Sequence, residues 1–99
     1  MKFLVTVTPR RLQMPPAAVI EQAIAWINGT IADKTVDCCY GFMTGGGVSI
    51  FNADSADSMM KLLMSYPGYP FVDFKVEPLC DINIALEQVK AMAKRAAGG

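Results

Sequence analysis

Apolar residues in this 99-residue chain recur first at every second position and then at every third or fourth, and the order of these two periods constrains the fold more than any other feature. Period-two segments rich in β-branched and aromatic residues predict strands at residues 2–8, 35–42, 48–51 and 71–77. Helical spacing predicts a helix from Pro15-Pro16 to Asp33-Lys34, a short helix through residues 59–64 and a last helix through residues 82–93. The expected order is therefore strand, helix, strand, strand, helix, strand, with one added helix.

Glycine and proline divide these elements. The run Gly45-Gly46-Gly47 predicts a hairpin turn, because a strand follows it and the helix and Lys-Ser/Thr of a phosphate-binding loop do not. The segment Tyr66 to Pro70 contains two prolines and a glycine, so it should end the second helix. We expect Pro78 to close the fourth strand, and residues 96–99 to form a flexible tail.

Right-handed crossovers turn this order of elements into a four-stranded antiparallel sheet, in the order 4-1-3-2, with both main helices on one face. The expected fold is thus a ferredoxin-like α+β domain spanning residues 1–99. Apolar residues make up 53% of the chain and charged residues 18%, against about 25% charged in an average soluble domain. Because the second face of the sheet would be bare on so apolar a chain, we expect a homodimer or larger homo-oligomer.

The charge balance and the absence of histidine exclude several kinds of function. Nine basic and nine acidic residues give no net charge, which disfavours nucleic acid or an anionic membrane as a partner. Without histidine, the usual metal ligand and general base are missing, so we expect no metal site. The cysteines are expected to be reduced and buried, namely Cys38, Cys39 and Cys80. The early break in the first apolar run and the lack of a spanning segment favour the cytoplasm.

Residues 63–80 resemble the muconolactone isomerase family. In that family a Leu-Met helix end is followed by two prolines three apart, an aromatic residue, an aspartate, a valine and a leucine. The matching residues here are Leu63, Met64, Pro67, Pro70, Phe71, Asp73, Val76, Leu79 and Cys80. The resemblance implies a dimeric α+β barrel and a lactone isomerase of aromatic-compound catabolism that needs no cofactor. The chain departs from the family at Gly45-Gly46-Gly47, where the family carries a histidine before the third strand.

An allylic proton shift without a cofactor needs a base, a hydrogen-bond donor for the developing enolate oxygen and a dry pocket. Asp73, Lys75 and Glu77 share one face of the fourth strand, and the first strand should place Lys2, Leu4 and Thr6 on the same side. Asp73 is the candidate base, with Lys75 and Glu77 as candidate substrate-binding residues. The alternative role of Asp73 is a structural ion pair with Lys75 or Lys2.

Three tyrosines are further candidates. Tyr40, in phase with Val36, Cys38 and Phe42 on the second strand, is a candidate hydrogen-bond donor to the enolate, or else a core or interface tyrosine. Tyr66 and Tyr69 flank the two-proline turn, where they can close a pocket mouth or simply lie on the surface. In the first loop, Arg10 and Arg11 can attract a carboxylate substrate or be solvated.

Three functions remain open at this point. The first is a cofactor-independent isomerase that moves a proton and a double bond in a small lactone or related carbonyl compound. The second is a non-catalytic protein that binds a small ligand or serves assembly on the same scaffold, which the missing histidine favours. The third is a cofactor-free oxygenase or cyclase of a phenolic substrate. The pocket can lie within one chain or between chains.

Overall fold

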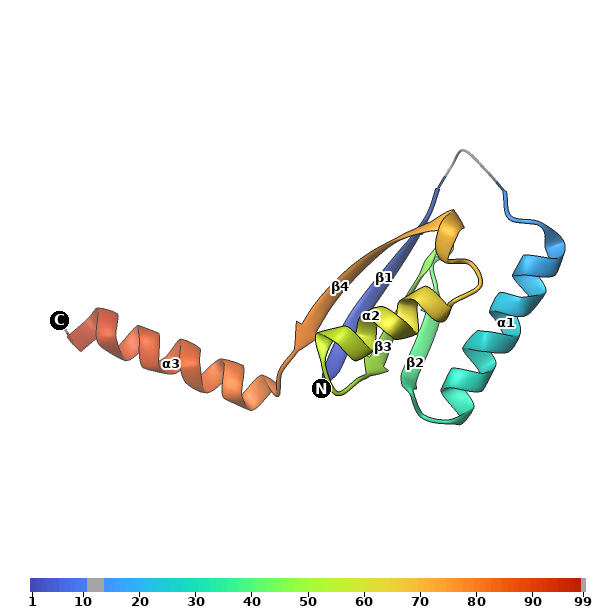
Figure 1. The fold of residues 1–99 in the computed structure, drawn as a ribbon. Coiled ribbons are helices and arrows are strands. Elements are labelled where there is room, and N and C mark those ends of the chain that lie inside the picture. The colour runs from blue at the N-terminus through green and yellow to red at the C-terminus, as the bar shows by residue number, and fades with distance from the viewer. Residues whose placement is uncertain (11–13, 99) are drawn as a thin grey trace.

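The computed structural model describes residues 1–10 and 14–98 and contains one four-stranded antiparallel sheet with three α-helices (Figure 1). The strands are ordered β2-β3-β1-β4. This order and the ferredoxin-like α+β class confirm the prediction from the sequence. The elements are β1 (Lys2–Pro9), α1 (Ala17–Ala32), β2 (Val36–Gly41), β3 (Gly47–Asn52), α2 (Ala56–Ser65), the 3-10 helix η1 (Tyr69–Phe71), β4 (Val72–Leu79) and α3 (Ile82–Gly98).

The core lies between one face of the sheet and the helix α2. Phe3 and Val5 of β1 pack with Phe51 of β3 against Met59 and Leu63 of α2, and all five are buried. Burying each such side chain contributes about 1.5–3 kcal/mol relative to leaving it in water. The side chain of Ser55 caps α2 by accepting a hydrogen bond from the backbone N–H of Ser58 at 3.1 Å. The sheet and α2 are therefore fixed to each other by a continuous apolar contact.

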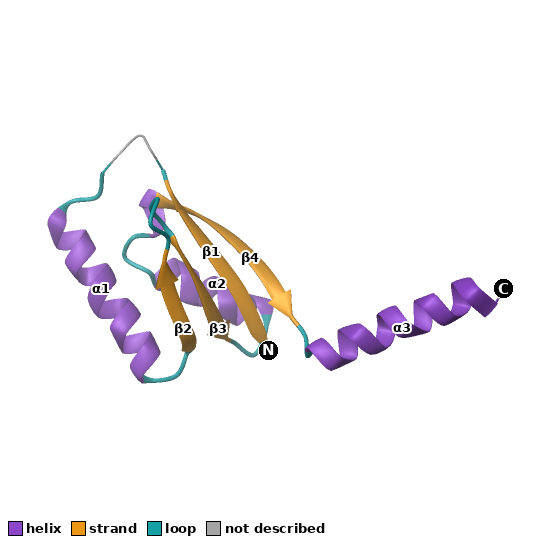
Figure 2. Cartoon of the chain, turned by 180° about the vertical axis from the view of Figure 1, so that it is seen from behind, coloured by secondary structure: helices purple, strands orange, loops and turns teal. Residues whose placement is uncertain are grey.

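The opposite face of the sheet, here called the open face, is not covered by any helix in the described parts of the chain (Figure 2). The register places Leu4 beside Ile50 and Glu77, and Thr6 beside Val48 and Lys75. At one end of this face, the ammonium group of Lys2 hydrogen-bonds to Asp37 and to Asn52. The hydrogen bond from Lys2 lowers the pKa of Asp37, and a second hydrogen bond from Asn52 adds to the effect.

Two details of the strands differ from the prediction. Pro78 does not close β4, because the strand continues to Leu79 and Pro78 pairs with Phe3. β4 lies at the edge of the sheet, where a missing N–H can face solvent without breaking a ladder. A register shift between Val36 and Cys38 also breaks the expected phase of β2. As a result Val36 joins the core, whereas Cys38 lies opposite Ile50 on the open face.

The last helix, α3, extends away from the rest of the molecule (Figures 1 and 2). None of its described residues is buried. The radius of gyration is 17.3 Å, whereas a compact domain of this length has about 13 Å. The helix runs through residues 96–98, so the flexible tail expected at 96–99 stays a prediction, and Gly99 lies outside the described residues. Of the helices described, none has the length and apolar character needed to span a membrane.

The hairpin turn between β2 and β3 requires glycine at position 46, and a substitution there tests this requirement. Gly46 has φ +81°, and a Cβ there would lie 2.1 Å from the carbonyl oxygen of Val7. We expect Gly46→Ala to lower the free energy of unfolding by at least about 2 kcal/mol in urea denaturation, because both the backbone conformation and the space exclude a side chain.

Gly29 provides the matched control, since it lies in α1 and a Cβ added there would have no atom within 4 Å apart from its chain neighbours and the backbone of its own helix. Gly29→Ala should raise the free energy of unfolding by about 0.5–1 kcal/mol, because alanine favours a helix interior. Equal destabilisation by the two substitutions would contradict the described hairpin.

Candidate functional site

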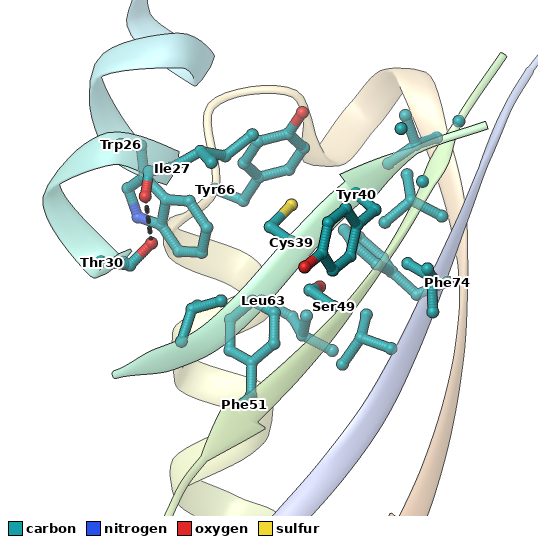
Figure 3. Close-up of a pocket in the computed structure, with 18 of the residues that line it drawn as sticks. Trp26, Ile27, Thr30, Cys39, Tyr40, Ser49, Phe51, Leu63, Tyr66 and Phe74 are labelled. Atoms are coloured by element: carbon teal, nitrogen blue, oxygen red, sulfur yellow. Dashed lines mark hydrogen bonds between the residues drawn. The ribbon is translucent and has the colours of Figure 1, made fainter. Parts of the chain in front are cut away.

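The face of the sheet that packs against α2 is here called the helix face. A cavity of about 420 Å³ lies between this helix face and α1 (Figure 3). All four strands, α1 and the end of α2 contribute to its wall. Its lining is mainly apolar and aromatic, and includes Val5, Val7, Trp26, Ile27, Phe51, Leu63, Tyr66, Val72 and Phe74. A volume in this range is typical of sites for small organic molecules.

Trp26 stands between α1 and the rest of the core. Its ring centroid lies 6.1 Å from that of Phe51 and 5.2 Å from that of Tyr66, the latter in an edge-to-face arrangement. The indole Nε1–H donates to Ser65 Oγ at 3.2 Å, and Ser65 Oγ in turn donates to the Leu62 carbonyl at 2.6 Å. The indole is thereby held in one orientation, and α1 is held away from the sheet by the width of this ring.

The polar groups of the cavity are few and uncharged. Ser49 is buried on β3, and Figure 3 shows the sulfur of Cys39 pointing toward Tyr66. Burial raises the pKa of the Cys39 thiol, and neighbouring Cys38 adds to this. Burial also raises the pKa of the Tyr66 phenol, with Cys39 as the second cause. Both groups are therefore protonated hydrogen-bond donors at neutral pH, and neither is an anionic nucleophile.

The absence of a side chain at Gly68 leaves room for the ring of Tyr66 in the cavity wall. A Cβ at Gly68 would lie 2.7–2.9 Å from the ring and hydroxyl of Tyr66, so the aromatic ring occupies space that only glycine leaves open. Tyr66 also packs edge-on against Phe74, with 6.1 Å between ring centroids. Tyr69, in η1, stacks on the same Phe74 ring at 5.7 Å. The turn predicted from Pro67 and Gly68 thus places one tyrosine in the cavity wall and the other behind it.

Asp73, Lys75 and Glu77 lie outside this cavity, since they alternate with the cavity residues Val72 and Phe74 along β4. The register confirms that they share the open face with Leu4 and Thr6. Arg10 Nε donates to Asp73 Oδ1 at 2.9 Å, and the Asp73 side chain is 65% exposed. Lys75 Nζ lies 3.2 Å from Glu77 Oε1. The ion pair expected for Asp73 thus involves Arg10 and not Lys75 or Lys2.

Tyr40 is separated from these charged residues by the width of the sheet. The register aligns Tyr40 with Val48, Val48 with Thr6, and Thr6 with Lys75. Three strand spacings of about 4.8 Å put about 14 Å between the backbones of Tyr40 and Lys75. The tyrosine side chain is largely exposed, although the residue also borders the cavity. Tyr40 and Asp73 therefore share the open face but lie on its two opposite edge strands, so the structure does not bring them together. Tyr66 lies on the other face, in the cavity wall.

Comparison with known proteins shows which family this chain belongs to and which solved structures have its fold. The model of the DUF3303 family, described as a domain of unknown function, matches residues 1–94. The chain belongs to the DUF3303 family. No curated protein sequence matches it. Among solved structures, muconolactone isomerase is similar with a TM-score of 0.72 and 22% identity, over 82% of this chain and 90% of that chain.

A second solved structure has the same fold. It is the 5-chloro-2-hydroxyhydroquinone dehydrochlorinase of Burkholderia phenoliruptrix AC1100, in complex with 2,5-dihydroxybenzoquinone. The TM-score is 0.61 at 15% identity, over 81% of this chain and 94% of that chain. The fold of this DUF3303 chain is thus one that solved enzymes also have, and at these identities the likeness shows the fold alone.

Some cavity residues were not predicted as site residues from the sequence. Ser49 and Phe51 alternate with their neighbours along β3, so this alternation could have predicted that the Ser49 hydroxyl lies on the helix face. Cys39 was predicted to be a buried thiol, and the structure places it half-buried in the cavity wall, with Cys38 half-buried on the open face. Cys80 is exposed, so the prediction of burial was wrong there, because the residue lies in the short link between β4 and α3. Arg11 lies outside the described residues.

The environment of Cys39 predicts its reactivity. A raised pKa leaves less thiolate at pH 8, so Cys39 should react with iodoacetamide at least about fivefold more slowly than exposed Cys80, and its rate should still rise above pH 9. Mass spectrometry of the alkylated peptides after timed quenching measures both rates, with the denatured protein as control. A native Cys39 rate equal to that of Cys80 would contradict the placement of Cys39.

Proposed function

We propose that this chain binds a small, uncharged ring compound carrying a carbonyl or hydroxyl group in the cavity beneath α1. The observation that carries the proposal is the combination of an apolar, aromatic wall with the neutral donors Tyr66, Cys39 and Ser49. No acidic or basic side chain of the described residues lines this cavity. A charged ligand would lose its hydration there without gaining a counter-charge, whereas a neutral ring loses little.

The comparisons support the size of the ligand and its single ring. The dehydrochlorinase of the same fold is in complex with 2,5-dihydroxybenzoquinone, a single six-membered ring with carbonyl and hydroxyl groups. A ring of that size fits a cavity of about 420 Å³. The rings of Trp26, Phe51 and Phe74 offer faces and edges for stacking. Binding, with or without a reaction, is thus the function that the geometry of the cavity favours.

A pair of probes of almost equal shape tests this proposal. 4-Hydroxyacetophenone is neutral and 4-hydroxybenzoate is an anion, so we expect the neutral compound to bind at least about tenfold more tightly. Trp26 is the only tryptophan of the chain and lines the cavity, so its fluorescence should report binding. Equal affinity for the two probes, or no change in the fluorescence with either, would contradict the proposal.

Substitution of Tyr66 refines this test. Tyr66→Phe removes one hydrogen-bond donor from the cavity and should weaken binding of 4-hydroxyacetophenone about fivefold. Tyr69→Phe is the matched control, because Tyr69 lies behind Phe74 and does not line the cavity. The Tyr69→Phe variant should bind 4-hydroxyacetophenone with the same affinity as the protein without substitutions.

The second candidate function is a cofactor-independent isomerase that moves a proton and a double bond within a lactone. The specific observation in its favour is the charged edge of the open face, where Arg10 and Lys75 alternate with Asp73 and Glu77. An acidic lactone such as muconolactone carries a carboxylate, which these cations can hold. Asp73 would then act as the base, in a site completed when a second copy covers the open face. Lys75 and Glu77 would bind the substrate.

Deuterium uptake separates this candidate from binding in the cavity. If Asp73 is the base, the protein incubated with muconolactone in deuterated water should exchange and isomerise the lactone, and Asp73→Asn should lower the rate at least about a hundredfold. Asp57→Asn, at the exposed start of α2, is the control and should leave the rate unchanged. No uptake above buffer, or full activity of Asp73→Asn, would remove the isomerase with Asp73 as base.

The isomerase proposal includes a cytoplasmic homodimer without a cofactor. Leu4, Val48 and Ile50 form an apolar strip across the open face and are only half-buried within the chain. Contact with the same face of a second copy would bury this strip, and the charged residues of β4 would border it.

A further inference from the structure

Ser49 is a buried residue in the cavity wall whose hydroxyl has no hydrogen-bond partner among the described residues. The residue is 7% exposed and lies on β3. The other buried hydroxyl of the wall, that of Thr30, already donates to the Ile27 carbonyl at 2.9 Å. No fully buried side-chain oxygen of the described residues lacks a partner, so the Ser49 oxygen is accessible from the cavity. A ligand oxygen there would supply the hydrogen bond that an apolar wall does not.

The two sides of Ser49 along β3 differ in how much space they leave. Residues two apart on a strand lie on the same face about 7 Å from each other, so Phe51 and Gly47 flank Ser49 on the helix face. The Phe51 side is filled, because Phe51 is buried and the ring of Trp26 lies 6.1 Å from its ring. On the other side Gly47 has no side chain. A ligand that bonds to Ser49 therefore has space on the side of Gly47.

A row of paired residues crosses the sheet at Gly47. The register aligns this row across all four strands as Gly41, Gly47, Val7 and Phe74, and all four residues line the cavity. The neighbouring row begins with Cys39 directly opposite Ser49. We call the space over Gly41 and Gly47 the glycine hollow. Ser49 and Cys39 border the glycine hollow on one side, and Val7 continues its floor toward Phe74.

The ring of Phe74 forms the far border of the glycine hollow and is held in place. Tyr66 packs edge-on against Phe74 at 6.1 Å, and Tyr69 stacks on it at 5.7 Å. Gly47 and Phe74 lie two strand spacings apart, or about 10 Å between backbones. The hollow therefore has a fixed aromatic border on one side and the width for a single ring.

We propose that the glycine hollow holds the ring of the ligand and that Ser49 determines specificity by donating a hydrogen bond to a carbonyl oxygen on or beside that ring. This assignment rests on the proposed binding function and narrows the ligand class to single-ring ketones and aldehydes. A carbonyl oxygen only accepts hydrogen bonds, and the Ser49 hydroxyl and the neighbouring Cys39 thiol each have a proton to donate.

The variant Ser49→Ala tests the role of the hydroxyl. Acetophenone and ethylbenzene have the same ring and differ by a carbonyl in place of a methylene group. In isothermal titration calorimetry, Ser49→Ala should raise the dissociation constant of acetophenone about fivefold and should not raise that of ethylbenzene. Ser58→Ala, on α2 and outside the cavity, is the matched control and should change neither affinity.

The variant Gly41→Val tests the position of the ring. Apart from its chain neighbours, a Cβ at Gly41 would have only the Gly46 carbonyl oxygen within 4 Å, at 3.9 Å, and valine suits a strand. The added side chain would occupy the glycine hollow, so both dissociation constants should rise at least about tenfold without a lower melting temperature. Gly41→Ala should give a smaller rise. Cys38→Val, on the open face of the same strand, is the control and should leave both affinities unchanged.

The outcomes separate this assignment from the proposed function. Unchanged affinity of Ser49→Ala for acetophenone would overturn the role of Ser49. Unchanged affinities of folded Gly41→Val or Gly41→Ala would overturn the placement of the ring. In both cases binding elsewhere in the cavity would stand. If the protein without substitutions binds neither acetophenone nor ethylbenzene, the proposed function is wrong and the assignment is wrong with it.

Discussion

The one-sided packing of the sheet against α2 is the contact on which the rest of the structure depends. Phe3, Val5 and Phe51 meet Met59 and Leu63 in a continuous core, and among the described residues of α1 it is Trp26 that packs against this core. α1 is instead held off by the indole of Trp26, which bonds to Ser65 and packs on Phe51. The cavity is the direct result of having one close helix and one distant helix over the same face.

The two faces of the sheet differ in the chemistry they offer. The cavity face has hydroxyl and thiol donors in an apolar wall, and suits a neutral ring. The open face has a charged edge along β4 beside an apolar strip, and suits contact with a second copy or an anionic compound. Because alternate residues of β4 serve opposite faces, Asp73 and Phe74 are neighbours in sequence but belong to different environments.

The sequence was enough to predict the order of elements, the order of the strands and the shared face of Asp73, Lys75 and Glu77, since these follow from periodicity and handedness. The bulge in β2 was not predictable from alternation, and because of it Val36 and Tyr40 lie on opposite faces of the sheet. The cavity was not predictable either, because its volume depends on how far Trp26 holds α1 from the sheet. The prediction that Pro78 closes β4 was wrong, because a proline ends a strand only where a backbone N–H is needed for a ladder hydrogen bond, and an edge strand such as β4 can lack one.

Xenon binding in a crystal tests most directly whether α1 leaves a persistent apolar cavity over the sheet. Xenon occupies dry apolar cavities without needing a specific polar partner. In crystals held under xenon pressure, the account predicts a xenon site between Trp26, Phe51 and Phe74. A structure in which α1 has closed onto the sheet and no xenon lies beneath it would contradict the account.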